Sequence, residues 1–172
     1  MFGYFLRQEN ASAVDLFSKV PAGFRHVFDL GTGSGNMLAC LSTDVDKFGF
    51  DLNRAMLRYA KDHSEARFIQ CDVKKLPLKD GCGEVMLLIG VLEYIQNPDD
   101  VFSEFRRVAA RGSHVIFTFT QRNLMNVLRN VLGHRVHTMK FNEIEEKIAD
   151  YGFRVIHSHR LKLQTQLLIE KI

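Results

Sequence analysis

The chain has 172 residues, of which 46% are hydrophobic and 25% charged, with a formal net charge of +3. These values are typical of an ordinary globular protein, so we expect a single domain over residues 1–172. No apolar run approaches the roughly 20 residues that cross a membrane, and the first residues lack the features of a secretory signal. The three cysteines lack C-x-x-C spacing and the histidines lack an H-E-x-x-H pattern. We therefore expect reduced thiols, a cytoplasmic location and no metal site.

Strand and helix patterns alternate along most of the chain. The predicted helices cover residues 9–19, 34–42, 53–61, 98–109 and 141–150. The predicted strands cover residues 26–30, 45–50, 67–70, 84–90, 115–119, 153–161 and 165–172. Repeated βαβ units favour a mostly parallel sheet with helices on both faces, and the tight connection between the last two strands makes them antiparallel. The predicted fold is α/β, with five parallel strands and a C-terminal antiparallel hairpin strand.

Local signals predict several helix ends. Asn53 is the expected N-cap of the helix that runs to residue 61. The helix at 141–150 is expected to begin at a cap formed by Asn142 or Thr138 and to stop at Gly152. Four residues at helical spacing predict the buried face of the helix at 98–109: Val101, Phe102, Phe105 and Val108.

A glycine-rich loop follows the first predicted strand. Residues 27–36 read V-F-D-L-G-T-G-S-G-N, with Asp29 before the loop and glycines at Gly31, Gly33 and Gly35. Glycine permits unusual backbone angles, and a β-carbon here would block a ligand from the loop. Open α/β sheets build nucleotide-sized crevices where a strand turns through such a loop into a helix. The spacing departs from the dinucleotide pattern G-x-G-x-x-G because Asn36 takes the last position, and a glycine turn without a ligand stays an alternative.

Two acids follow the next two strands. Asp51 lies about twenty residues after the loop, where a carboxylate can accept hydrogen bonds from both hydroxyls of a ribose. Leu52 is then placed to lie against a base. Asp72 and Val73 follow the third predicted strand. For Asp72, a loop aspartate that caps its own turn is the alternative interpretation.

The pattern D-x-G-x-G-x-G at residues 29–35 resembles the first motif of class I S-adenosylmethionine (SAM)-dependent methyltransferases. Further motifs follow in the order of that family: an acid at Asp72, the loop L-P-L-K-D-G at residues 76–81, a buried strand, and L-E-Y-I-Q-N-P at residues 92–98. This set is similar to the small-molecule subgroup that includes the quinone-biosynthesis enzymes, and it spans residues 27–120. The chain departs from the family at residues 83–84 and 109–113, where Phe-Asp and Lys-Pro-Gly-Gly are usual.

The resemblance implies a Rossmann-like methyltransferase sheet and SAM as the cofactor. It implies that Asp72 bonds the adenine amino group and that the Val73 amide meets a ring nitrogen. We expect the carbonyl of Ile89 or Gly90 and the loop at Gly31 to receive the methionine ammonium. The expected cofactor-binding residues are Asp29, Gly31, Gly33, Gly35, Asp51, Leu52, Asp72, Val73, Ile89 and Gly90.

A long segment without acids begins within the fourth predicted helix. No Asp or Glu occurs between Glu104 and Glu143, and the segment holds Arg106, Arg107, Arg111, Arg122, Arg129, Arg135 and Lys140. Residues 121–140 lie where the methyl acceptor binds in related folds, and a positive field there would attract a carboxylate or phosphate. A solvated helix face with snorkelling arginines, an amphipathic lid and a protein contact are the alternatives. Nucleic acid is disfavoured because the basic residues are neither dense nor interleaved with aromatics. No feature fixes an oligomeric state.

Methyl transfer is a displacement at an activated carbon, so the protein mainly aligns the reactants, and a base helps only if the acceptor must lose a proton. Candidate bases are Glu93 and Tyr94, just past the fourth strand, and His134 or His137. A first-turn helix glutamate favoured by the dipole is the alternative for Glu93. The predicted function is methyl transfer from SAM to a small or peptide-sized acceptor, for which an anionic group is a candidate. The alternatives are a catalytically silent SAM-binding partner subunit, an aminopropyltransferase and a nicotinamide-dependent oxidoreductase.

Overall fold

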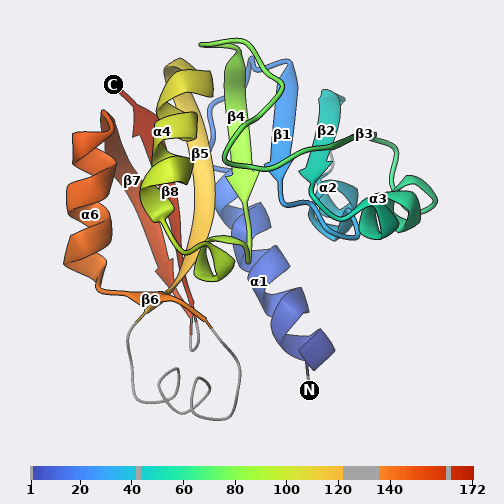
Figure 1. Ribbon diagram of the computed structural model, residues 1–172, viewed down its shortest axis with the longest axis horizontal. Helices are drawn as coiled ribbons and strands as arrows, with labels where there is room; N and C mark the ends of the chain where they lie inside the picture. Colours follow the sequence, from blue (N-terminus) through green and yellow to red (C-terminus); the bar gives the residue numbers. More distant parts are fainter. Residues whose placement is uncertain (1, 42–43, 122–135, 162–163) are drawn as a thin grey trace.

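The computed structural model describes residues 2–41, 44–121, 136–161 and 164–172 (Figure 1). Its main strands form one sheet in the order β3-β2-β1-β4-β5-β8-β7. Their bounds are β1 His26–Leu30, β2 Asp46–Asp51, β3 Arg67–Gln70, β4 Gly83–Leu88, β5 Ala109–Gln121, β7 Phe153–Arg160 and β8 Thr165–Lys171. The strands from β3 to β5 pair in parallel, whereas β8 is antiparallel to both β5 and β7. The predicted parallel sheet with a C-terminal antiparallel hairpin is confirmed.

Helices cover both faces of the sheet. The helices are α1 Phe2–Phe17, α2 Asn36–Cys40, α3 Arg54–Lys61, α4 Pro98–Val108 and α6 Phe141–Asp150, and a short 3-10 helix, η1, covers Leu92–Tyr94. In Figure 1, α4 and α6 lie in front of the sheet, while α1 and α2 lie behind it. Each layer encloses its own apolar core, one beneath α4 and α6 and the other beneath α1 and α2.

The core beneath α4 follows the predicted helical spacing. Val101, Phe102, Phe105 and Val108 are all buried. The Phe102 ring packs edge-on against Phe117 of β5, with 5.6 Å between ring centroids. Aromatic pairs in this geometry bury large areas and add a favourable electrostatic contact, so α4 is firmly fixed on the sheet.

The predicted C-terminal stop of α6 is correct, whereas its predicted N-caps are not. Gly152 lies just past the helix with φ of 79°, as expected of a C-terminal stop. Both predicted N-caps are wrong, because α6 begins after Lys140, whose backbone N–H donates to the Glu143 side chain over 3.0 Å. Thr138 instead belongs to a short strand that the sequence analysis missed, β6 (Thr138–Met139), which pairs with the end of β5. Asn142 lies inside the first helical turn.

Other boundaries differ where the backbone turns. β4 ends at Leu88 rather than at residue 90, because Gly90 has φ of 70° and leaves the ladder, its N–H donating to the Thr118 hydroxyl over 2.7 Å. β5 begins at Ala109 rather than at residue 115, since a register irregularity lets Ala109 pair with Gly83. α1 begins at Phe2 rather than at residue 9, and α2 covers only part of its predicted range.

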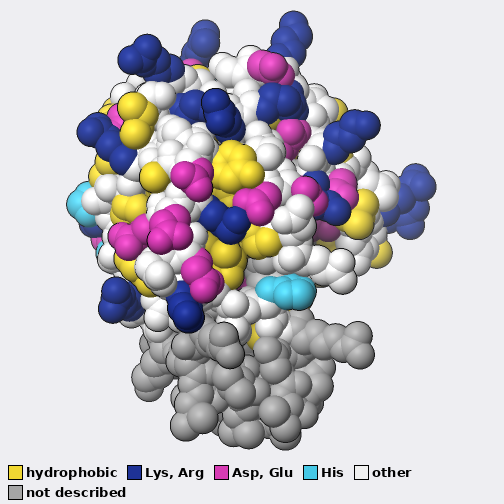
Figure 2. Space-filling view, turned by 60° about the vertical axis from the view of Figure 1, so that its left-hand side comes forward, with side chains coloured by type: hydrophobic (Ala, Val, Ile, Leu, Met, Phe, Trp, Pro, Cys, Tyr) yellow, Lys and Arg dark blue, Asp and Glu magenta, His cyan; other side chains and the backbone are white. Residues whose placement is uncertain are grey.

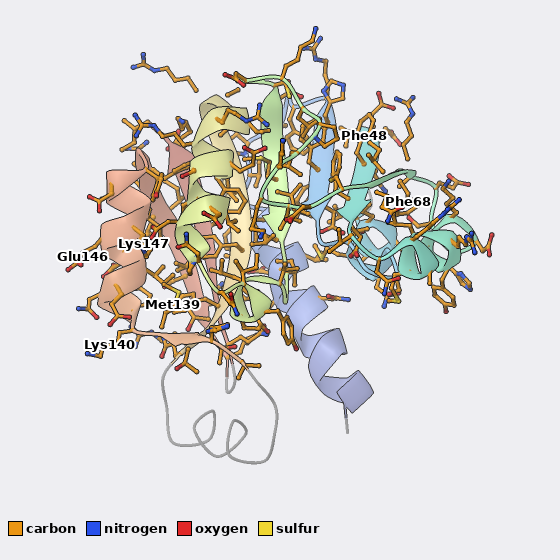
Figure 3. The ribbon with its side chains drawn as sticks, in the orientation of Figure 1. Phe48, Phe68, Met139, Lys140, Glu146 and Lys147 are labelled. Atoms are coloured by element: carbon orange, nitrogen blue, oxygen red, sulfur yellow. The ribbon has the colours of Figure 1, made fainter. Side chains whose placement is uncertain are left out.

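The glycine loop makes room for the protein's own side chains. Gly31 has φ of 75°, its N–H donates to the Phe50 carbonyl over 2.7 Å, and an added Cβ would clash with Val91. A Cβ on Gly35 would lie 3.3 Å from the Phe68 ring, which Figure 3 places at the β3 end of the sheet. Intramolecular packing therefore also favours glycine at Gly31 and Gly35, and the role of the loop glycines in leaving space for a ligand stays a prediction.

Substitution of Gly31 by Ala should destabilise the fold more than the same change at Gly112. Both glycines have nearly equal φ, 75° and 74°, but an added Cβ at Gly112 meets open space. Gly112→Ala should lower the free energy of unfolding by about 1–2 kcal/mol, the cost of a left-handed conformation. Gly31→Ala should lower it by roughly 3 kcal/mol or more, because overpacking against Val91 adds to that cost. Urea unfolding measures both, and equal losses would contradict the role assigned to Val91.

Candidate cofactor site

The carboxyl ends of the parallel strands meet at one edge of the sheet, the lower edge in Figure 1. A cleft of about 650 Å³ opens there between the loops after β1, β2, β3 and β4 and the first turn of α4. Ligands bind at this edge in open α/β sheets. The cleft is lined by six of the ten expected cofactor-binding residues: Gly31, Asp51, Leu52, Asp72, Val73 and Gly90.

A smaller cavity of about 160 Å³ adjoins the cleft. Asp29 and Ile89 line the smaller cavity, and Gly31 and Gly90 line both. The two spaces therefore meet at the turns that follow β1 and β4. Gly33 and Gly35 line neither space. The structure thus brings eight of the ten predicted residues to one continuous site, and the other two shape the loop beside it.

Asp51 is held in place by two backbone hydrogen bonds. Its Oδ2 accepts the Gly33 N–H over 2.8 Å, and its Oδ1 accepts the Asn53 N–H over 2.7 Å. Asn53 in turn caps α3, as predicted, by accepting the N–H groups of Ala55 and Met56. A carboxylate has about four acceptor positions, so each Asp51 oxygen keeps one for a ligand in the cleft. The side chain is therefore pre-oriented and still able to accept two more hydrogen bonds.

Asp72 both caps its own turn and faces the cleft, which are the two alternatives that the sequence analysis left open. Its Oδ1 accepts the Lys74 N–H over 2.9 Å, so it caps its own turn. The side chain nevertheless remains 41% exposed and lines the cleft. Two apolar residues line the same space, the nearly buried Val73 and Leu52, which is 67% exposed. The cleft therefore offers carboxylates for polar ligand atoms and apolar surface for a flat ring.

Asp29 is a buried acid at the inner end of the site. It is 2% exposed, and the Thr32 hydroxyl donates to its Oδ2 over 2.6 Å. Burial raises the pKa of Asp29 to about 7; the Thr32 hydrogen bond opposes this shift and the negative charge of Asp51 adds to it. The group therefore changes its protonation state near neutral pH, and a cation in the smaller cavity would favour the carboxylate.

The candidate bases occupy different environments. Tyr94 is 63% exposed and lines the cleft. Glu93 is buried, and the Gln164 amide donates to its Oε1 over 2.6 Å. His137 is exposed, donates its backbone N–H to the Glu93 carbonyl and lines neither space. His134 falls outside the described residues. A role as a base stays a prediction for each, and Tyr94 is the one that the cleft makes accessible.

A buried polar face that the sequence analysis missed lies next to Gly90. Thr118 and Thr120 of β5 are buried, and Thr118 accepts the Gly90 N–H. Gln164, just before β8, is also buried. Within the described part of the chain, the Thr120 hydroxyl and Gln164 Oε1 have no hydrogen-bond partner, although buried polar atoms normally have one. The alternation of threonine and phenylalanine at residues 117–120 was the available signal.

The family model described as a methyltransferase domain matches residues 28–117, which is more than half of the chain. The chain belongs to this methyltransferase family. The matched range begins in β1 and ends in β5, so it contains every loop that builds the cleft. The predicted family, class I SAM-dependent methyltransferases of small-molecule type, and the predicted cofactor, SAM, are confirmed.

Two curated relatives of the chain are both named as O-methyltransferases. The chain is 28% identical over 115 residues to malonyl-[acyl-carrier protein] O-methyltransferase of Marinomonas, covering 62% of this chain and 43% of the relative. It is 26% identical over 123 residues to the ubiquinone biosynthesis O-methyltransferase of Ralstonia nicotianae, covering 67% of this chain and 52% of the relative. The chain thus spans about half the length, or less, of these relatives.

Solved structures share the fold of this methyltransferase. One is the magnesium protoporphyrin IX methyltransferase of Synechocystis, solved with bound S-adenosylhomocysteine (SAH). It superposes with a TM-score of 0.79 at 18% identity and covers 96% of this chain and 83% of its own. At this identity the likeness concerns the fold alone, and it agrees with the mixed sheet described above.

The pKa of Asp29 predicts a specific pH dependence of stability. Between its ordinary pKa of 3.8 and about 7, the unfolded chain loses a proton that the folded chain keeps. The contribution of Asp29 to the free energy of unfolding is therefore complete below this pH window. It falls as pH rises through the window, by up to about 1.4 kcal/mol per pH unit. The difference in unfolding free energy between wild type and Asp29→Asn, measured with urea, should follow this slope.

Thr32→Val provides the matched control for this pH dependence. It removes the hydroxyl that favours the carboxylate, so the window should extend to higher pH. Parallel stability curves for the wild type and Asp29→Asn across the window would show that Asp29 keeps its ordinary pKa.

Proposed function

We propose that the chain binds SAM across the two joined cavities and transfers its methyl group to a small or peptide-sized acceptor. The observation that carries the proposal is the Asp51 carboxylate, fixed by Gly33 and Asn53 and still open toward the cleft. When bound, SAM supplies a methyl group on a sulfonium leaving group. The protein then contributes alignment, which is worth several kcal/mol, up to about 7–11 in favourable models.

The residues present fit this cofactor in three places. Asp51 has acceptor positions for the two ribose hydroxyls. Leu52 and Val73 offer apolar surface for the adenine, and Asp72 offers an acceptor for its amino group. The smaller cavity, with the Asp29 carboxyl and the turn at Gly90, suits the methionine ammonium, because a cation there would offset the cost of ionising a buried acid.

We place the acceptor beside Gly90, along the polar face of Thr118, Thr120 and Gln164. Two buried polar atoms on this face lack partners in the described structure, and an acceptor with hydrogen-bonding groups would satisfy them. An exposed phenol, Tyr94, lies at the cleft and is our candidate for a base if the acceptor must lose a proton.

An anionic acceptor remains part of the proposal, but fewer basic residues support it than the sequence analysis expected. Arg106 and Arg107 of α4 and Arg111 of β5 lie near the start of β5, at the opposite edge of the sheet from the cleft. Of the other cations in this segment, Lys140 is exposed, and Arg122, Arg129 and Arg135 lie outside the described residues. Figure 2 shows acidic and basic side chains interspersed on the described part of its face, which also disfavours nucleic acid.

The location proposed for the protein is the cytoplasm. The three cysteines, Cys40, Cys71 and Cys82, are free thiols, which suit a reducing compartment. In the described ranges, no helix combines the length and apolar character that crossing a bilayer requires.

Asp51→Asn should weaken SAM binding at least about tenfold, because an amide cannot accept the same set of hydrogen bonds from a ribose and the loop. Isothermal titration calorimetry measures the affinity. The matched control is Asp46→Asn at the other end of β2, where Asp46 pairs with Arg67 on the surface; it should leave SAM affinity within about twofold. Unchanged affinity in Asp51→Asn would show that the ribose lies elsewhere.

The same titrations separate the rival functions. Binding of NADH without binding of SAM would replace the methyltransferase proposal with an oxidoreductase. Transfer of labelled methyl from SAM to a component of cell extract separates an active enzyme from a silent partner subunit. An aminopropyltransferase would instead use decarboxylated SAM and leave SAM itself unconsumed.

Thr120→Val and Gln164→Leu should reduce methyl transfer to the extract acceptor about tenfold or more while leaving SAM affinity unchanged. Thr120→Val removes only the hydroxyl that we assign to the acceptor, whereas Gln164→Leu removes the assigned oxygen together with the amide that donates to Glu93. Initial rates with labelled SAM, together with calorimetry, test both statements. Full transfer rates in both variants would place the acceptor away from this face.

A further inference from the structure

The guanidinium group of Arg107 makes an unusually complete set of contacts near the end of α4. Its Nη1 donates to the Leu78 carbonyl and to Asp80, both over 2.7 Å, and its Nη2 donates to the Leu76 carbonyl over 3.1 Å. Its Nε and Nη2 donate to the two oxygens of Glu104, over 2.8 and 2.5 Å. These five hydrogen bonds match the five N–H donors of an arginine.

Glu104 connects this group to the backbone of the same loop. It is 8% exposed, and its Oε1 also accepts the Leu76 N–H over 2.6 Å. The hydrogen bond from Arg107 holds the pKa of Glu104 below its usual range against the opposing effect of burial. Arg107 and Glu104 therefore hold Leu76 by both its N–H and its carbonyl, and they hold the loop as far as Asp80.

The held loop is continuous with the turn that lines the cleft. The Asp72 carbonyl accepts the Lys75 N–H over 2.9 Å, and the Asp72 side chain accepts the Lys74 N–H. Leu76 follows this turn directly, so its anchored backbone fixes one end of the turn. The first turn of α4 also reaches the cleft, through Asn97 and Asp100. One helix thus contacts the cleft directly and holds the loop that shapes it.

We propose that Arg107 is a positioning residue that sets selectivity for adenine by fixing the turn at residues 72–76. This inference rests on the proposed function, in which Asp72 and Val73 recognise the adenine edge. A hydrogen-bonded site discriminates against an analogue that lacks the matching group only while its own groups are held in place. Without the hydrogen bonds of Arg107, the turn at residues 72–76 can change its shape to fit other bases. Selectivity for adenine then falls even when the chain stays folded.

The test compares two ligands, SAH and S-inosylhomocysteine, in which the adenine amino group is replaced by oxygen. Calorimetry gives the ratio of their dissociation constants for the wild type and for Arg107→Met and Arg107→Lys. The wild type should prefer SAH at least about tenfold. Arg107→Met should reduce this ratio to roughly threefold or less, and Arg107→Lys, which keeps the charge but has fewer donors in another geometry, should lie between.

Lys147→Met is the matched control. Lys147 of α6 also pairs with α4, with its Nζ 2.5 Å from Asp99, but it does not contact the loop at residues 76–80. Figure 3 shows Lys147 directed from α6 toward α4. This variant removes an ion pair to the same helix, so a general loss of stability affects it too, while its ligand ratio should equal that of the wild type. Affinities are compared below the melting temperature of each variant.

The outcomes separate this inference from the function beneath it. A wild type that does not bind SAH overturns the proposed function. A wild type that prefers SAH, with variants that keep the full preference, overturns the role of Arg107 alone. If Arg107→Met does not fold, Arg107→Lys decides in the same way. A uniform loss of affinity for both ligands, with an unchanged ratio, would show that Arg107 serves only stability.

Discussion

The cleft end of the sheet depends on one carboxylate that holds both the glycine loop and the start of α3. Asp51 accepts the N–H of Gly33 from the loop after β1 and the N–H of Asn53 at the start of α3. Charge-assisted hydrogen bonds of this kind are short and directional, so the loop and the helix cannot move independently. The glycine loop, which has little side-chain packing of its own, thereby takes its position from a neighbouring strand.

A second group of contacts does the same on the other side of the cleft. α4 is fixed on the sheet by Phe102 and its aromatic neighbours, and Arg107 and Glu104 near its end hold the loop after β3. The cleft is therefore bordered by two irregular segments, each tied to a regular element by hydrogen bonds. Ordering a loop costs conformational entropy, and this cost is met during folding rather than when a ligand binds.

The sequence predicted the parts of the molecule whose signals are local. The parallel pairing of the first five strands follows from the βαβ alternation, and the Asn53 cap and the Gly152 stop follow from residue chemistry. The start of α6 was missed because β6 exists only through its pairing with β5, which no local pattern reveals. The contacts of Arg107 and the hydrogen bond from Gln164 to Glu93 were missed for the same reason, since they join residues far apart in the chain.

Two groups that oppose folding lie at the edge of the sheet that holds the cleft. Asp29 is a buried acid, and the hydroxyl of Thr120 lacks a partner among the described residues. Natural sequences are otherwise locally consistent, and they tolerate such departures chiefly where function requires them. A ligand that supplies a cation near Asp29 and hydrogen bonds near Thr120 would offset these costs and stabilise the folded state by mass action. The unfavourable groups thus support the proposed place of the ligand at this edge of the sheet.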